Sequence, residues 1–168
     1  MKRISQLYPA LGLAAALAMT PVVALAHDDG HSGHSHGPAS FEAGQPGDRA
    51  APSRRIDVTA HEGEGAMSYT PASVDVKSNE QIEFVIKNEG LLDHEFVIGS
   101  EIENAAHAAL MQAMPNMAHN DPNAVQVKAG GTATLVWKFT TPGTFEFACL
   151  VPGHYEAGMK GGITVRSP

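Results

Sequence analysis

The sequence of 168 residues contains a single cysteine, so no disulfide can form within the chain. Basic residues are also few, since 11 Lys and Arg stand against 18 Asp and Glu, and the formal net charge is −7. Nucleic-acid binding needs a basic surface, so this balance excludes a nucleic-acid partner. Charged residues make up 17% of the chain and hydrophobic residues 43%, which is enough to bury the core of one domain.

The sequence also lacks an apolar run that is long enough to span a bilayer. The longest candidate, Leu7 to Met19, is too short. It follows the basic pair Lys2 and Arg3, and it precedes a small-x-small cleavage site that ends at Ala26. Residues 1–26 are therefore predicted to be a secretory signal peptide. We expect the mature protein to be periplasmic and to have no membrane span.

Residues 27–54 are predicted to be a disordered leader, because Phe41 is their only large apolar side chain. Four histidines gather at the start of this leader, namely His27, His31, His34 and His36. Histidine-rich tracts bind divalent metal ions. The leader is therefore either a metal-capturing segment or a solvated linker with incidental histidines.

The pattern changes at Arg55, where short runs of alternating apolar and polar residues begin. These runs continue to the C-terminus and are separated by turn residues. The spacing predicts an all-β fold, a Greek-key β-sandwich of seven or eight strands over residues 55–168. The segment from Glu101 to Met114 is predicted to be a short helical insertion that Pro115 ends.

The single cysteine belongs to a group of possible metal ligands. Cys149, His154 and Met159 have the spacing Cys-x4-His-x4-Met, and the group begins at the end of a predicted strand. A thiolate, two imidazoles and a weak axial thioether suit copper, and His94, at the start of another strand, is the best source of the second imidazole. The alternative is that Cys149 is a core residue, His154 a loop histidine and Met159 a packing residue.

From about residue 55 onward the chain resembles the cupredoxins, the blue-copper family of plastocyanin, azurin and rusticyanin. The Cys-x4-His step is similar to azurin, and the His-x4-Met step is similar to plastocyanin. The resemblance implies a type 1 copper site with His94, Cys149 and His154 as equatorial ligands and Met159 as the axial ligand. The family usually carries Asn after the first histidine. Here Glu95 takes that place, and a carboxylate near copper could change its reduction potential.

A second group of soft donors falls in and after the predicted helix. Its members are His107, Met111, Met114, Met117 and His119. The first three would share one helical face. Thioethers favour Cu(I), so the group is a candidate accessory copper site, together with the leader histidines. The alternative is an amphipathic helix that packs its methionine face on the sandwich.

These features together resemble exported bacterial cupredoxins associated with copper tolerance. We expect a copper-homeostasis protein with a redox-active Cu(I)/Cu(II) centre, whose partners are copper ions. The alternative is a dedicated single-electron carrier that docks a cytochrome or a copper enzyme. We expect no enzymatic activity, because Ala148 and Leu150 flank Cys149 where a multicopper oxidase carries histidines.

Overall fold

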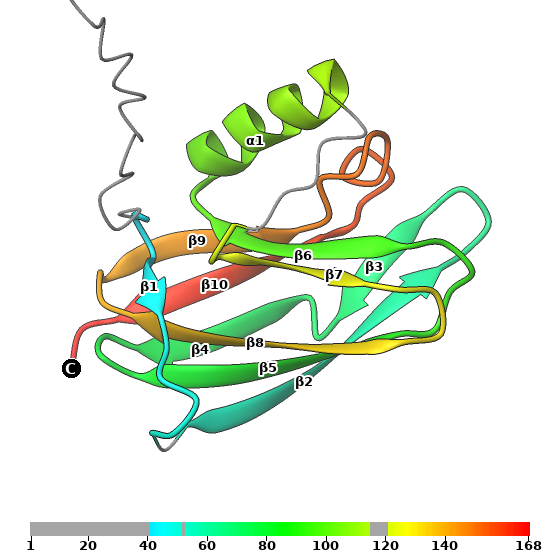
Figure 1. Cartoon of the computed structure of the whole chain (residues 1–168). Helices are drawn as coiled ribbons and strands as arrows, with labels where there is room; N and C mark the ends of the chain where they lie inside the picture. The colour runs from blue at the N-terminus through cyan, green and yellow to red at the C-terminus, as the bar shows by residue number, and fades with distance from the viewer. Residues whose placement is uncertain (1–40, 52, 115–120) are drawn as a thin grey trace, which may run out of the picture. The chain divides into compact units, whose positions relative to one another are not determined.

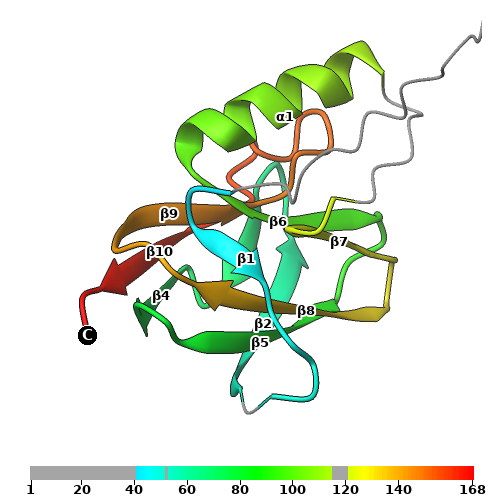
Figure 2. The same cartoon turned by 60° about the vertical axis from the view of Figure 1, so that its left-hand side comes forward.

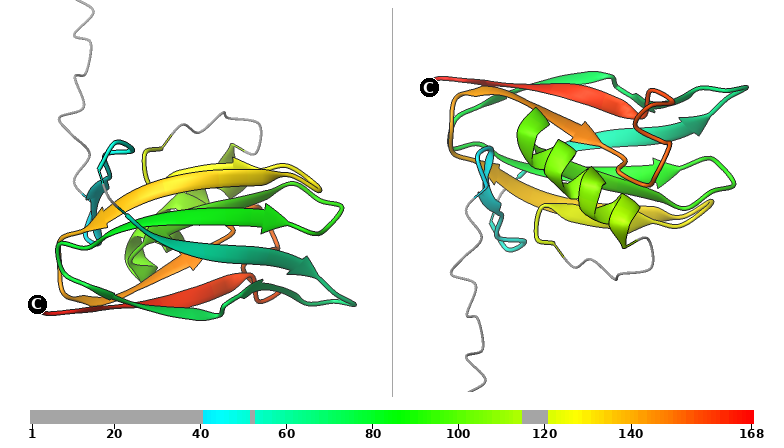
Figure 3. Two further views of the ribbon diagram at one scale, coloured as in Figure 1. Left: turned by 90° about the horizontal axis from the view of Figure 1, so that it is seen from below. Right: turned by 90° about the horizontal axis from the view of Figure 1, so that it is seen from above.

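A computed structural model describes residues 41–168 apart from residues 52 and 115–120, and these residues form ten strands and one helix (Figure 1). The strands lie in two five-stranded sheets (Figure 3). The first sheet contains, in spatial order, β1 (Gly44–Pro46), β8 (Thr132–Phe139), β5 (Gln81–Asn88), β2 (Arg54–Glu62) and β3 (Met67–Thr70). The second contains β4 (Ser73–Lys77), β10 (Lys160–Arg166), β9 (Gly143–Ala148), β6 (His94–Gly99) and β7 (Ala124–Val127). The predicted all-β sandwich is confirmed, with more strands than expected.

The core between the sheets is built from alternate residues of each strand. Along β5, Ile82, Phe84 and Ile86 are buried, as the two-residue period of a strand requires. The ring of Phe84 lies 5.3 Å from that of Phe96 in the opposite sheet, and Phe96 stacks on Phe147 at 5.0 Å. The first contact joins the two sheets, and the second lies within the second sheet, where Phe147 is two residues before the cysteine.

The strand β1 lies inside the segment that the sequence analysis assigned to a disordered leader. It pairs antiparallel with β8, and Phe41 packs edge-on against Trp137 with 5.4 Å between ring centroids. The leader prediction is therefore wrong for the described residues between 41 and 54. A three-residue edge strand is held mainly by backbone hydrogen bonds, so it leaves almost no apolar alternation in the sequence. Residues 1–40, with the predicted signal peptide, lie outside the described residues.

Helix α1 (Glu101–Ala113) agrees with its prediction to within one residue. The Glu103 backbone N–H donates to the Ser100 hydroxyl at 3.2 Å, and the Ser100 N–H donates to the Glu103 carboxylate at 2.8 Å. This capping box starts the helix, and Pro115 follows its end. The helix lies on the outer face of the second sheet (Figures 2 and 3). Among the described residues, no helix has the length and apolar character needed to cross a membrane.

Candidate metal centre

Two neighbouring strands bring the predicted donors together. His94 is the first residue of β6, and Cys149 directly follows β9. The two strands are antiparallel, with Val97 opposite Ala148, so the start of β6 lies beside the end of β9. The backbone N–H of Glu95 donates to the Cys149 sulfur at 3.3 Å. The strand pairing therefore brings together His94 and Cys149, which are 55 positions apart in the sequence.

Three donor atoms converge at this point. The Nδ1 atoms of His94 and His154 are 3.1 Å apart. The Cys149 sulfur lies 3.3 Å from His154 Nδ1 and 3.9 Å from His94 Nδ1. All three residues offer a ligand atom within 4.8 Å of the others, so one metal ion can be reached by all of them.

The loop between β9 and β10, residues 149–159, is here called the ligand loop. Its backbone fixes its own shape, since the Cys149 N–H donates to the Met159 carbonyl and the Met159 N–H to the His154 carbonyl, both at 3.0 Å. Gly153 and Gly158 have φ angles of +88° and +102°, which favour glycine. Met159 is fully buried in the same core cluster as Cys149. The loop thus preorganises the positions of all three of its potential ligands.

Burial controls the protonation of these groups. Cys149 and His94 are buried, whereas His154 is half-buried. Burial raises the pKa of the Cys149 thiol to about 11, so without a metal ion the thiol keeps its proton at neutral pH. Burial, and then the nearby His94 ring, lower the pKa of His154. The imidazole is therefore available as a neutral ligand, and a bound metal ion would displace the thiol proton.

The structure adds one residue that the sequence analysis missed. Glu62 ends β2, and its Oε1 lies 3.0 Å from Nε2 of His94, the ring nitrogen that does not face Cys149. The same oxygen accepts the Leu92 backbone N–H at 2.8 Å, and this bond lowers the pKa of Glu62. No motif links two residues that are 32 positions apart. Only the register of the parallel strands β2 and β5 could have indicated the contact.

The two acidic neighbours of His94 have other roles. Asp93 accepts hydrogen bonds from Lys128 Nζ at 2.7 Å and from the Ala129 N–H at 3.0 Å. Glu95 is buried, and its backbone carbonyl accepts the Tyr69 hydroxyl. The Glu62 carboxylate, in contrast, lies within hydrogen-bond distance of the His94 ring.

The predicted accessory residues are described only in part. His27, His31, His34, His36, Met117 and His119 lie outside the described residues. The Nδ1 atom of His107 lies 3.6 Å from an Asp121 carboxylate oxygen. Met111 is buried and Met114 is 42% exposed, so these two thioethers lie in different surroundings. The accessory copper site remains a prediction.

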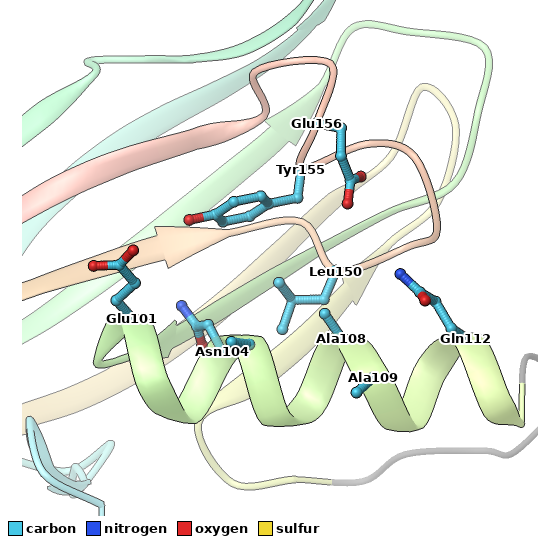
Figure 4. A pocket seen from close by; sticks show the side chains of 9 residues that line it. Glu101, Asn104, Ala108, Ala109, Gln112, Leu150, Tyr155 and Glu156 are labelled. Carbon is cyan, nitrogen blue, oxygen red and sulfur yellow. The ribbon is translucent and has the colours of Figure 1, made fainter.

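A cavity of about 320 Å³ lies between α1 and the ligand loop (Figure 4). Leu150 and Tyr155 line it from the loop, and Ala108 lines it from the helix. His94, Cys149 and His154 do not line this cavity. The donor group is therefore separate from it.

The β-sandwich with two imidazoles and one buried thiol at its end defines a class, the cupredoxin-type copper proteins. None of the three donors is an oxygen atom, which disfavours Mg²⁺ and Ca²⁺, and a His₂Cys group next to a buried methionine fits copper. Residues 56–166 match the model of the copper binding proteins of the plastocyanin/azurin family. The chain belongs to this family, and copper is its cofactor, as the sequence predicted.

Similar proteins include the copper-resistant cuproprotein CopI of Rubrivivax gelatinosus, which is 46% identical over 95% of this chain and 97% of its own length. The protein of the same description from Pseudomonas aeruginosa is 36% identical over 77% of this chain and 86% of its own. Among solved structures, auracyanin B matches with a TM-score of 0.59 and 25% identity, over 73% of this chain and 96% of its own.

Proposed function

We propose that this chain binds one copper ion in a type 1 site and acts in copper tolerance in the periplasm. His94, Cys149 and His154 are the equatorial ligands, and Met159 is the axial ligand. The observation that carries the proposal is the convergence of the three donor atoms within 4.8 Å. The relatives described as copper-resistant cuproproteins support the physiological part.

The residues around the site suit a metal ion that changes its oxidation state while its ligands keep their positions. Bound copper supplies a one-electron Cu(I)/Cu(II) couple. The ligand loop holds Cys149, His154 and Met159 through its own backbone hydrogen bonds, so these side chains need little rearrangement. Burial of Cys149 excludes water and oxidants from the thiol. We also propose that the chain is not an enzyme, because the residues that flank Cys149 are Ala148 and Leu150.

Copper titration with visible spectroscopy tests the site. The purified protein should develop an intense thiolate-to-copper absorption that saturates at one equivalent of Cu(II). Cys149→Ala should abolish this absorption, because the thiolate is the electron donor of the transition. Met114→Leu, which changes an exposed methionine outside the donor group, is the control and should leave the absorption unchanged. An absorption that persists in Cys149→Ala would refute the type 1 site.

The physiological role is tested by growth. A strain without the gene should become sensitive to added copper, and the wild-type gene, but not the Cys149→Ala gene, should restore tolerance. Whether the leader histidines bind further ions is tested by counting the copper ions bound per chain. The count for the wild type is compared with that for a variant in which His27, His31, His34 and His36 are all replaced by Ala. Unchanged copper tolerance in the deletion strain would exclude the homeostasis role.

A second candidate function is a dedicated electron carrier, and the exposure of Leu91 and Leu92 favours it. These side chains are 89% and 46% exposed, and Leu92 is joined to the site through Glu62 and His94. An exposed apolar rim that is linked to a copper ligand suits brief docking of a redox partner. A carrier requires one copper per full chain and normal copper tolerance in the deletion strain.

A further inference from the structure

The backbone around the Glu62 carboxylate holds it in one position. The Leu92 N–H donates to its Oε1 at 2.8 Å. A side-chain carbon at position 90 would overlap this carboxylate, so any other residue there would force the Glu62 side chain to shift. The Glu62 side chain is only 21% exposed. The carboxylate is therefore fixed, although it lies at the end of a strand.

The loop that holds Glu62 is itself anchored. Asn88 is fully buried, and its side-chain oxygen accepts the Gly90 N–H at 2.8 Å. Its amide nitrogen donates to the Leu92 carbonyl at 2.7 Å and to the Val127 carbonyl at 3.1 Å. Residues 88–92 are thereby tied to β7 next to His94, and the Leu92 N–H that binds Glu62 cannot move away easily.

We propose that Glu62 is a positioning residue that fixes the tautomer and orientation of His94 and sets the reduction potential of the copper site; this inference rests on the proposed type 1 site. A carboxylate accepts hydrogen bonds, so the Nε2 atom at 3.0 Å carries the proton of the neutral ring. The lone pair is then on Nδ1, the atom that faces Cys149 and His154. This tautomer is the one required to bind the metal.

The carboxylate also places a fixed negative charge behind a ligand. A negative charge near the metal stabilises Cu(II) relative to Cu(I), because the oxidised ion carries the larger positive charge. Glu62→Gln keeps the shape and a hydrogen-bond acceptor but removes the charge. It should bind one copper ion and show a higher reduction potential than the wild type. Glu62→Ala also removes the acceptor and should bind Cu(II) about 10–100-fold more weakly.

The matched control is Glu89→Gln, which removes a charge from the same loop. Glu89 pairs with Lys87 at 2.8 Å, and its carboxylate is half exposed. The reduction potential of Glu89→Gln should stay near that of the wild type. The metal-free protein provides an independent readout, since ¹⁵N NMR of His94 should show a proton on Nε2 in the wild type and a mixture of tautomers in Glu62→Ala.

The inference would be overturned if the reduction potential of Glu62→Gln did not differ from those of Glu89→Gln and the wild type. It would equally be overturned if the His94 tautomer were unaffected by Glu62→Ala, since Glu62 would then only anchor the loop. Failure of the proposed function looks different, because it removes the Cys149-dependent absorption from the wild type itself. The tautomer measurement needs no copper and tests Glu62 in either case.

Discussion

The two sides of the metal centre are built in different ways. The ligand loop contributes Cys149, His154 and Met159 from eleven consecutive residues, and its hydrogen bonds are mostly internal. The other side, here called the His94 side, consists of His94, Glu62 and residues 88–92. Its contacts come from β2, β5 and β6, so it exists only after the sheets have formed. The ligand loop therefore provides the donor chemistry, and the His94 side depends on the sandwich to hold its imidazole.

The largest expected effect distinguishes His94 from His154. His94→Ala and His154→Ala should each remove the thiolate-to-copper absorption of the loaded protein, because each removes an equatorial ligand. Added imidazole should restore it only in His154→Ala, since that position is half-buried, whereas His94 is 1% exposed. Visible spectra at increasing imidazole concentration check this. Equal recovery in both variants would mean that the two sides are equally open to solvent.

The same difference explains how much could be predicted from the sequence. The Cys-x4-His-x4-Met spacing was visible because all three residues lie in one loop. The helix was visible because its apolar run ends at a proline, and most strands because their side chains alternate. Glu62 could not be found, since its role depends on the parallel register of β2 and β5. The edge strand β1 was missed because backbone pairing leaves no mark in the side chains.

A smaller effect is expected at Gly90, on the His94 side. Gly90→Ala places a carbon where the Glu62 carboxylate lies, so the loop or the carboxylate must shift. Such overpacking typically costs about 1–3 kcal/mol of unfolding free energy. Gly162→Ala is the matched control, because an added carbon there meets no atom within 4 Å. Urea denaturation of the metal-free proteins measures both. Equal stability of the two variants would show that the Glu62 position is not tightly constrained.

The smallest effect concerns the start of β2, the strand whose other end carries Glu62. There Arg54 Nε lies 2.6 Å from a Glu80 carboxylate oxygen, and Arg54 is 46% exposed. The hydrogen bond from Arg54 lowers the pKa of Glu80 from its ordinary value of 4.5. The pair therefore stabilises the folded chain above pH 4.5, and this contribution is lost as the pH falls through the lower folded pKa.

Because a partly exposed ion pair contributes only about 0.2–1 kcal/mol, Glu80→Gln should lower the unfolding free energy by no more than that at pH 7. The difference from the wild type should shrink as the pH falls from 4.5 through the lowered folded pKa of Glu80, since both chains then carry a neutral group at position 80. Urea denaturation at pH 7 and pH 3 checks this, with Glu64→Gln as an exposed control. The reduction potential should not change, because the pair lies at the opposite end of β2 from the copper ligands. A potential shift as large as that of Glu62→Gln would mean that overall charge, rather than contact with His94, tunes the site.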